Sequence, residues 1–215
     1  MPKYITEFIG TFFLVLTVGF AVVSNAPLGA LAIGSSLMIM IYMGGHISGG
    51  HYNGAVSLAV FLRGKIDAPT FIGYLISQFL GALAAAWIVY VVVGKTYPLA
   101  PAATATALQA LLVEILYTFA LCLVVLNVAT SPDTEGNSYY GLAIGFTIVV
   151  AAIAGGGISG GAFNPDVGSG PIVVDAILKG GSLSNLWLYI VGPFLGGALA
   201  AGVYRLQTST AATSS

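Results

Sequence analysis

The 215-residue sequence is 58% hydrophobic and only 6% charged, with a formal net charge of −1. Soluble domains carry about 25% charged residues, so this chain cannot cover an ordinary water-facing surface. The lack of a basic or acidic excess argues against a nucleic-acid partner. Its single cysteine, Cys122, lies in an apolar run. This excludes a disulfide framework and favours a packing role for the thiol.

Six segments are apolar and long enough to cross a bilayer, which takes about 20 residues. They are residues 4–24, 28–46, 68–93, 105–129, 138–156 and 185–206. We interpret the first as a spanning helix rather than a cleaved signal peptide, because more hydrophobic segments follow it. The small polar residues of 207–215 predict a disordered tail.

Two glycine-rich sequences interrupt this pattern, ISGGHYN at 47–53 and ISGGAFN at 158–164. Each ends in Asn, a preferred helix N-cap, and is followed by an apolar segment too short to span, 54–62 or 165–178. Pro165 falls at a first helical position, where its missing N–H costs nothing. We therefore predict two half-helices that enter the membrane and stop. Irregular backbone at that depth is tolerated only within protein or beside a watery cavity.

The breaks belong to a longer duplication of the sequence. Its matching positions are Glu7 with Glu114, Thr11 with Thr118, Tyr74 with Tyr189, and Phe79 with Phe194. Each half holds three spans, an odd number, so the second half enters from the opposite side. The predicted fold is an all-α membrane protein with six transmembrane helices, two re-entrant half-helices and an inverted 3+3 repeat. Residues 1–100 form the first repeat and 101–206 the second, within one structural domain.

The distribution of Lys and Arg predicts the orientation in the membrane. With the N-terminus inside, the cytoplasmic side holds Lys3, Arg63, Lys65 and Arg205, and the outer side holds Lys95 and Lys179. This modest bias predicts cytoplasmic termini at both ends of a multi-pass protein of the plasma or inner cell membrane.

The two half-helix N-termini are expected to meet near the midplane, where each carries roughly half an elementary positive charge. Cations are disfavoured there, whereas a water or hydroxyl oxygen is welcome. The amides of Asn53 and Asn164 add N–H donors at the same level. A water held by two donors points its hydrogens away, which interrupts a proton wire.

These motifs resemble the major intrinsic protein family, the aquaporins and aquaglyceroporins, over residues 4–206. The resemblance is carried by residues 45–53, Gln78 before Phe79, the two glutamates, Gly192-Pro193, Asn164-Pro165 and Gly170-Pro171. It implies six tilted helices around a narrow pore, a homotetramer in the lipid bilayer, and passive transport of water or small neutral solutes without a cofactor.

The motifs depart from the family's Asn-Pro-Ala, being Asn53-Gly54-Ala55 and Asn164-Pro165-Asp166. In the family the two motifs pack proline and alanine against each other. We expect the Asp166 side chain to fill the space that Gly54 leaves. The alternative is that Asp166 faces the pore, weakens the positive field at the centre and permits a cation or proton leak. The structural role is favoured, because intramembrane acids usually find a partner away from lipid.

The resemblance also places an outer constriction, at which the family's second motif is normally followed by Arg. Here that position is Val167, and the other three fall at Ile33, Ala152 and Gly161. Water-selective members tend to place an aromatic residue near Ile33 and a His near Ala152. An apolar mouth of this kind still opposes ions by dewetting. It is expected to be wider than a strict water filter and to admit glycerol, urea or ammonia.

Glu7 and Glu114 are interpreted as acceptors for N–H groups of the broken loops rather than as a proton relay. His51 is expected to brace its loop, and the spacing of possible ligands predicts no metal site. A secondary transporter shares inverted repeats and broken helices, but no coupling-ion site is evident. A closed or adhesive family member is a further alternative. An enzyme is the weakest, because no catalytic set of side chains converges.

Overall fold

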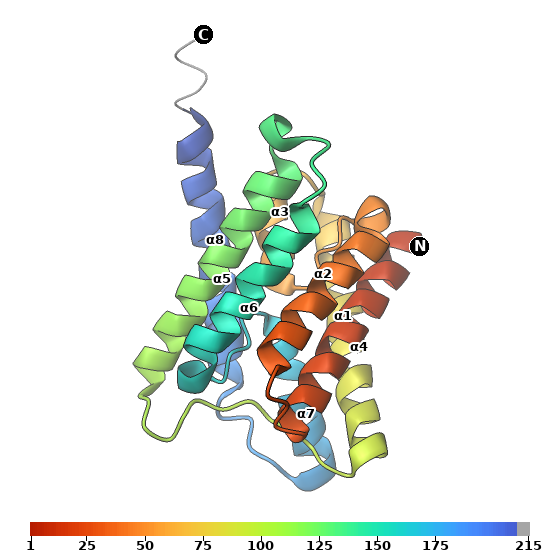
Figure 1. Cartoon of the computed structure of the whole chain (residues 1–215), viewed down its shortest axis with the longest axis vertical. Helices are drawn as coiled ribbons and strands as arrows, with labels where there is room; N and C mark the ends of the chain where they lie inside the picture. The colour runs from red at the N-terminus through yellow and green to blue at the C-terminus, as the bar shows by residue number, and fades with distance from the viewer. Residues whose placement is uncertain (210–215) are drawn as a thin grey trace.

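The computed structural model describes residues 1–209, which form helices and the loops that join them (Figure 1). In chain order the elements are α1 Pro2–Val23, α2 Gly29–Ser48, α3 Gly54–Leu62, α4 Ala68–Val93, α5 Ala107–Thr130, the 3-10 turn η1 Pro132–Thr134, α6 Tyr140–Ser159, α7 Pro165–Lys179 and α8 Leu186–Ser209. Within this described part, six helices are long and apolar enough to cross a membrane, and α3 and α7 are not among them. The predicted all-α architecture with six spans is confirmed.

The ends of the six predicted spans agree with the helices to within three residues. The prediction of a disordered tail from residue 207 is wrong for its first three residues, because α8 continues to Ser209. No Gly or Pro interrupts this stretch, and the Thr208 hydroxyl donates to the Tyr204 carbonyl at 3.1 Å. The rest of the tail, 210–215, lies outside the described residues. The second half-helix ends at Lys179, one residue beyond its predicted end, where Gly180 has φ +69°.

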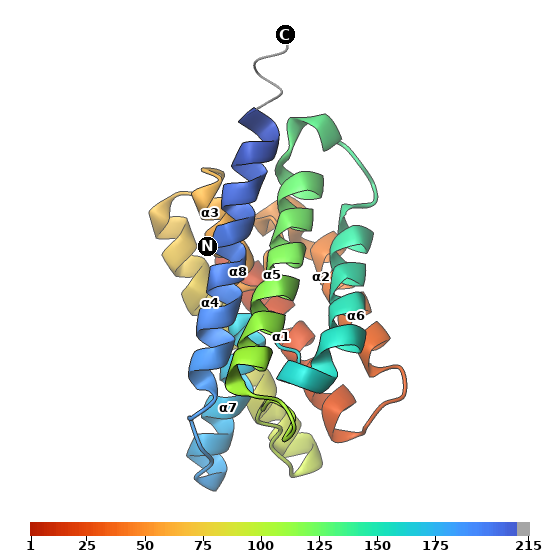
Figure 2. The ribbon, with the colours of Figure 1, turned by 90° about the vertical axis from the view of Figure 1, so that its left-hand side faces the viewer.

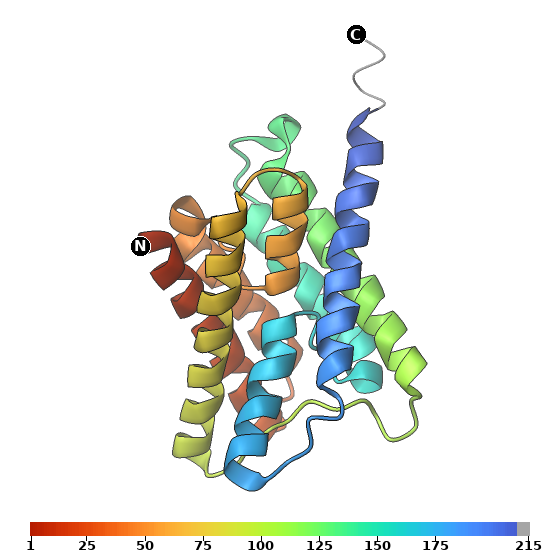
Figure 3. The same ribbon diagram turned by 180° about the vertical axis from the view of Figure 1, so that it is seen from behind.

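The two halves of the chain fold alike and interlock. α1 packs along α4 in the first half, and α5 packs along α8 in the second (Figure 2). The short helices are exchanged, since α3 packs against α8 and α7 against α4. Figure 3 shows α3 and α7 entering the bundle from opposite ends, with their first turns meeting in its middle. The halves therefore make one packed unit with the half-helices at its centre.

Glycine permits the close approach of the paired helices. A Cβ atom on Gly81 of α4 would lie 2.5 Å from the Phe8 carbonyl oxygen of α1. The same geometry recurs in the second half, where a Cβ on Gly196 of α8 would lie 2.5 Å from the Ile115 carbonyl oxygen of α5. Small residues allow such contact between membrane helices, which gains dispersion energy in the absence of a hydrophobic driving force.

Candidate functional site

Each half-helix follows a long helix that glycine ends. α2 stops at Gly49 with φ +92°, and α6 stops at Gly160 with φ +93°. Residues with a Cβ rarely adopt this conformation. Two bulky residues nevertheless have positive φ, Tyr52 at +47° and Phe163 at +52°, and both are buried. Such backbone persists only where its surroundings hold it.

The asparagines cap the half-helices in the way that the sequence pattern predicts. Asn53 Oδ1 accepts the backbone N–H groups of Ala55 at 2.8 Å and Val56 at 3.3 Å. Asn164 Oδ1 accepts the Asp166 N–H at 2.9 Å. Each cap satisfies N–H groups that have no partner within the helix, and caps of this type contribute about 0.5–2 kcal/mol.

The same two side chains also tie the breaks together. Asn53 Nδ2 donates to the Phe163 carbonyl at 2.9 Å, and Asn164 Nδ2 donates to the Tyr52 carbonyl at 2.8 Å. Both bonds join residues more than 100 positions apart. The half-helix tips are therefore in direct contact, and the cap geometry of one half depends on the loop of the other.

The buried side chain of Glu7, on α1, accepts hydrogen bonds from the first break. Its Oε1 accepts the Ser48 hydroxyl at 2.6 Å and the His51 N–H at 2.9 Å. Its Oε2 accepts the Tyr52 N–H at 2.7 Å and Gln78 Nε2 at 2.8 Å. The buried carboxylate thus serves four donors that would otherwise be unsatisfied away from water.

Glu114 of α5 holds the second break with a similar set of bonds. It accepts the Ser159 hydroxyl at 2.7 Å, the Ala162 N–H at 3.0 Å and the Phe163 N–H at 2.7 Å. Ser159 also accepts the Gly161 N–H through its Oγ at 3.1 Å. The N–H groups of Ala162 and Phe163 are therefore turned toward α5, while that of Gly161 is held by Ser159 at the end of α6.

This arrangement fixes where the carbonyl groups point. Residues 1–209 contain no cis peptide bond, and in a trans peptide the carbonyl lies opposite the following N–H. Because the N–H groups of residues 50–52 face Ser48 and Glu7, the carbonyls of 49–51 face the other way. By the same argument the carbonyls of 160–162 point away from Glu114. Gly50, His51 and residues 160–162 line a cavity, so the backbone of both breaks forms part of its wall.

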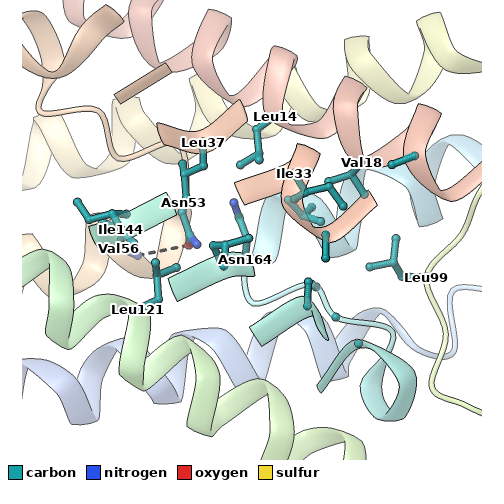
Figure 4. Close-up of a pocket in the computed structure, with 18 of the residues that line it drawn as sticks. Leu14, Val18, Ile33, Leu37, Asn53, Val56, Leu99, Leu121, Ile144 and Asn164 are labelled. Carbon is teal, nitrogen blue, oxygen red and sulfur yellow. Dashed lines mark hydrogen bonds between the residues drawn. The ribbon is translucent and has the colours of Figure 1, made fainter. Parts of the chain in front are cut away.

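That cavity has a volume of about 240 Å³ and is lined by residues of α1, α2, α3, α5, α6 and α7 and of both breaks. Figure 4 shows Asn53 and Asn164 next to each other in its wall, with apolar side chains on the surrounding helices. The apolar lining consists mainly of Leu14, Val18, Leu37, Val56, Leu121, Val125, Ile144 and Ile148. A permeating molecule would meet hydrogen-bonding groups on one side and hydrocarbon on the other.

A second cavity of about 620 Å³ adjoins the first, and His51 and Val125 line both. Its other lining residues come from α2, α3, α5, the start of α6, the first break, and the α3–α4 and α5–α6 loops, and include His46, Lys65 and Glu135. The shared residues mark the junction between a central passage and a polar vestibule at one end of the bundle.

The sequence has relatives along nearly its whole length. The family model of the major intrinsic proteins matches residues 1–204. The chain belongs to the major intrinsic protein family. It is 40% identical over 97% of its length to the glycerol uptake facilitator protein-like 6 of Lactiplantibacillus plantarum, 99% of which is covered. It is 35% identical over 96% of its length to the aquaporin NIP1-1 of Zea mays, 74% of which is covered.

The fold is also similar to a solved structure, the aquaglyceroporin from Plasmodium falciparum. The TM-score is 0.83 at 23% identity, with 94% of each chain covered. As a member of the major intrinsic protein family, this chain is an integral multi-pass membrane protein. It is a passive channel for water or small solutes rather than an enzyme.

The four residues expected at the family's outer constriction all line the central cavity. Ile33 comes from α2, Ala152 from α6, Val167 from α7, and Gly161 from the second break. Val167 is buried and contributes hydrocarbon where the family normally has Arg. The chain thus brings these residues together from four separate segments.

Asp166, by contrast, is not among the lining residues found within 1–209. Its side chain is 4% exposed, and its Oδ2 accepts the Gly54 N–H at 3.0 Å. The residue next to Gly54 in the motif, Ala55, is fully buried. Asp166 therefore points toward the opposite half-helix.

His51 has a double role in this member of the family. Its Nδ1 lies 3.0 Å from the Ser57 hydroxyl, and its ring meets Tyr74 edge to face at 5.1 Å. The imidazole thus contacts α3 and α4, and it also lines both cavities. Within the described range, no group of three His, Cys, Asp or Glu side chains is placed to hold a metal ion.

One lining segment was missed by sequence reasoning, the loop between α4 and α5. Leu99 of this loop lines the central cavity, and the Tyr97 hydroxyl anchors the loop to the Val15 carbonyl of α1 at 3.1 Å. Ala102 N–H adds a bond to the Ile158 carbonyl at 3.0 Å. The loop has no counterpart in the duplicated motifs, so only its apolar residues before Pro98 and Pro101 could have indicated burial.

Proposed function

We propose that this channel passes water together with small uncharged solutes, of which glycerol, urea and ammonia fit best. The observation that carries the proposal is the make-up of the outer constriction. Ile33, Ala152, Gly161 and Val167 offer no charge and no long polar side chain. Such a ring leaves room for a polyol beside the backbone carbonyls, and the similarity to a protein named as a glycerol uptake facilitator supports it.

Ion exclusion in this proposal depends on two features. The hydrocarbon lining cannot replace the hydration shell of an ion, so entry is opposed by dewetting. The N-termini of α3 and α7 and the amides of Asn53 and Asn164 add partial positive charge at the centre. Because the Asp166 carboxylate is engaged with Gly54, we favour a channel without a cation or proton leak over the leaky alternative or a coupled transporter.

We further propose that the protein is a homotetramer of the plasma or inner cell membrane with both termini in the cytoplasm. The oligomeric state is inferred from family membership. The orientation is inferred from the Lys and Arg residues at the end of the bundle that holds both termini. Lys3 on α1 donates to Thr70 of α4 at 2.8 Å, and Arg205 donates to the Leu62 carbonyl. These cations therefore gather at one end of the bundle, as the positive-inside rule requires.

The proposal is tested by stopped-flow swelling of proteoliposomes with water, glycerol and urea gradients, alongside a proton-leak assay. We expect all three to permeate without saturation or an ion requirement. Val167→Arg should reduce glycerol and urea flux much more than water flux, because it adds bulk and donors to an apolar ring. Val167→Met is the matched control, since it adds length without charge and should produce a smaller loss. Equal losses of water and solute in Val167→Arg would contradict this filter.

A further inference from the structure

The two residues that depart from the family's motifs contact each other. Gly54 is the first residue of α3, so its N–H has no acceptor within that helix. The Asp166 side chain reaches from the first turn of α7 and accepts this N–H at 3.0 Å. A proline at position 54 would have no N–H to satisfy. The glycine therefore creates a buried donor, and the aspartate supplies its acceptor.

The pairing is consistent with the pseudo-twofold symmetry of the fold. Asp166 is the third residue of the second motif, and Gly54 is the second residue of the first motif. The same symmetry pairs Ala55 with Pro165. Ala55 has no side-chain acceptor, and Pro165 has no backbone N–H. The Gly54 N–H thus has an acceptor in the opposite motif, whereas Pro165 has no N–H that would need one. The Asp166 carboxylate also lies at the positive N-termini of both half-helices, where an anion is stabilised.

A proline at position 54 would clash with Asp166, whereas loss of Asp166 alone would leave the Gly54 N–H without an acceptor. The ring of a proline replaces the amide hydrogen with a methylene carbon bonded to the nitrogen. In Gly54→Pro that carbon would point at Asp166 Oδ2, which lies 3.0 Å from the nitrogen, far inside van der Waals contact. The rest of the ring would also be tight. A Cβ on residue 54 would lie 3.0 Å from Leu75 Cδ2, the mobile end of a side chain, and 3.0 Å from Pro165 Cγ, a ring atom that would have to shift slightly.

We propose that Gly54 and Asp166 form an obligate hydrogen-bonded couple, the tip latch, that holds the two half-helix tips in register. Asp166 acts as a positioning residue, because its carboxylate does not line the passage. The latch joins the residue after the Asn53 cap to the second residue after the Asn164 cap. It therefore fixes the separation of the two amides that face the permeating molecule.

A double-mutant cycle tests the latch through the thermal stability of the purified full-length protein. Asp166→Ala strands a buried N–H and should lower the unfolding temperature on the order of 2 to 10 °C. Gly54→Pro should lower it at least as much, through the clash with Asp166. The double variant, which removes donor, acceptor and clash together, should be more stable than either single variant. Additive losses in the double variant would overturn the proposal.

Two conservative variants separate the hydrogen bond from other effects. Asp166→Asn keeps an oxygen acceptor without the charge and should lose less stability than Asp166→Ala. Gly54→Ala keeps the donor while adding a side chain, and should lose less than Gly54→Pro. If either pair proves equal, charge or volume rather than the hydrogen bond couples the tips, and the latch is rejected.

Water permeability per channel supplies a readout that a purely structural role would not move. We expect the reconstituted Gly54→Pro variant to conduct less water per folded protein than the parent. Adding Asp166→Ala to this variant should restore part of the lost water permeability. Folded variants that conduct water as the parent does would show that the latch does not position the asparagines. Only this readout depends on the proposed function, because the stability cycle gives its result even if nothing permeates.

Discussion

The buried carboxylates of Glu7 and Glu114 each hold two consecutive backbone N–H groups of a helix break. The sequence, through their duplicated positions and the resemblance to the family, predicts that both serve the broken loops. It did not predict the Gly54–Asp166 bond, for which only a match in volume was expected. That bond joins residues 112 positions apart, and its donor is a backbone group that no sequence pattern displays.

We predict that Glu114→Gln destabilises the fold by about 1–3 kcal/mol, the cost of one stranded buried donor. A carboxamide presents one oxygen and one NH2, so either Ala162 N–H or Phe163 N–H must face another donor. Thermal unfolding of the purified protein measures the effect. Thr118→Val is the control, because this hydroxyl, one turn along α5, is buried without a hydrogen-bond partner among the described residues. Equal losses in the two variants would contradict the assigned role of Glu114.

At the scale of the helices, sequence reasoning succeeded where an end has its own chemistry. Both ends of α4 were predicted correctly, because Asp67 caps it through the Thr70 N–H at 3.0 Å and Gly94 terminates it with φ +70°. The end of α8 was placed too early, since small polar residues predict disorder without marking a stop. The exchange of α3 and α7 between the halves depends on packing and has no local signal.

The glycines of α8 provide a prediction about helix packing. Gly196→Ala should destabilise the protein by about 1–3 kcal/mol, because its Cβ would lie 2.5 Å from the Ile115 carbonyl oxygen and force α8 from α5. Gly202 lies on the same helix, and a Cβ added there would meet no described atom within 4 Å. Gly202→Ala should therefore be neutral or stabilise by about 0.5–1 kcal/mol through helix propensity. Thermal unfolding of both variants checks the contrast, and similar shifts would argue against close packing as the reason for Gly196.

At the scale of the whole molecule, the inverted repeat gives the two ends of the bundle matching folds, whereas their charges differ. The end that holds the termini carries Lys3, Arg63, Lys65 and Arg205. The opposite end is organised by Asp175, which accepts the Thr96 hydroxyl at 2.5 Å, and by Lys179, which lies 4.9 Å from the centre of the Tyr90 ring. The repeat and its spans were predictable because apolar length and odd span number are properties of sequence. The position of the α4–α5 loop, whose Leu99 lines the central cavity, was not, because no repeat constrains it.

The orientation of the chain in the membrane can be tested by labelling introduced cysteines, because the protein's own thiol should not react. Cys122 has no exposed surface, so a membrane-impermeant maleimide should leave the parent unlabelled in intact cells. Glu135→Cys, in the loop between α5 and α6, should stay unlabelled until the membrane is opened. Thr104→Cys, in the loop between α4 and α5, should react at once, because both positions are exposed but lie at opposite ends of α5. The reverse labelling pattern would place the termini outside, and labelling of both variants in intact cells would mean that the chain inserts in two orientations. In either case the Lys and Arg bias would be too weak to set the topology, while the passage through the bundle would be unaffected.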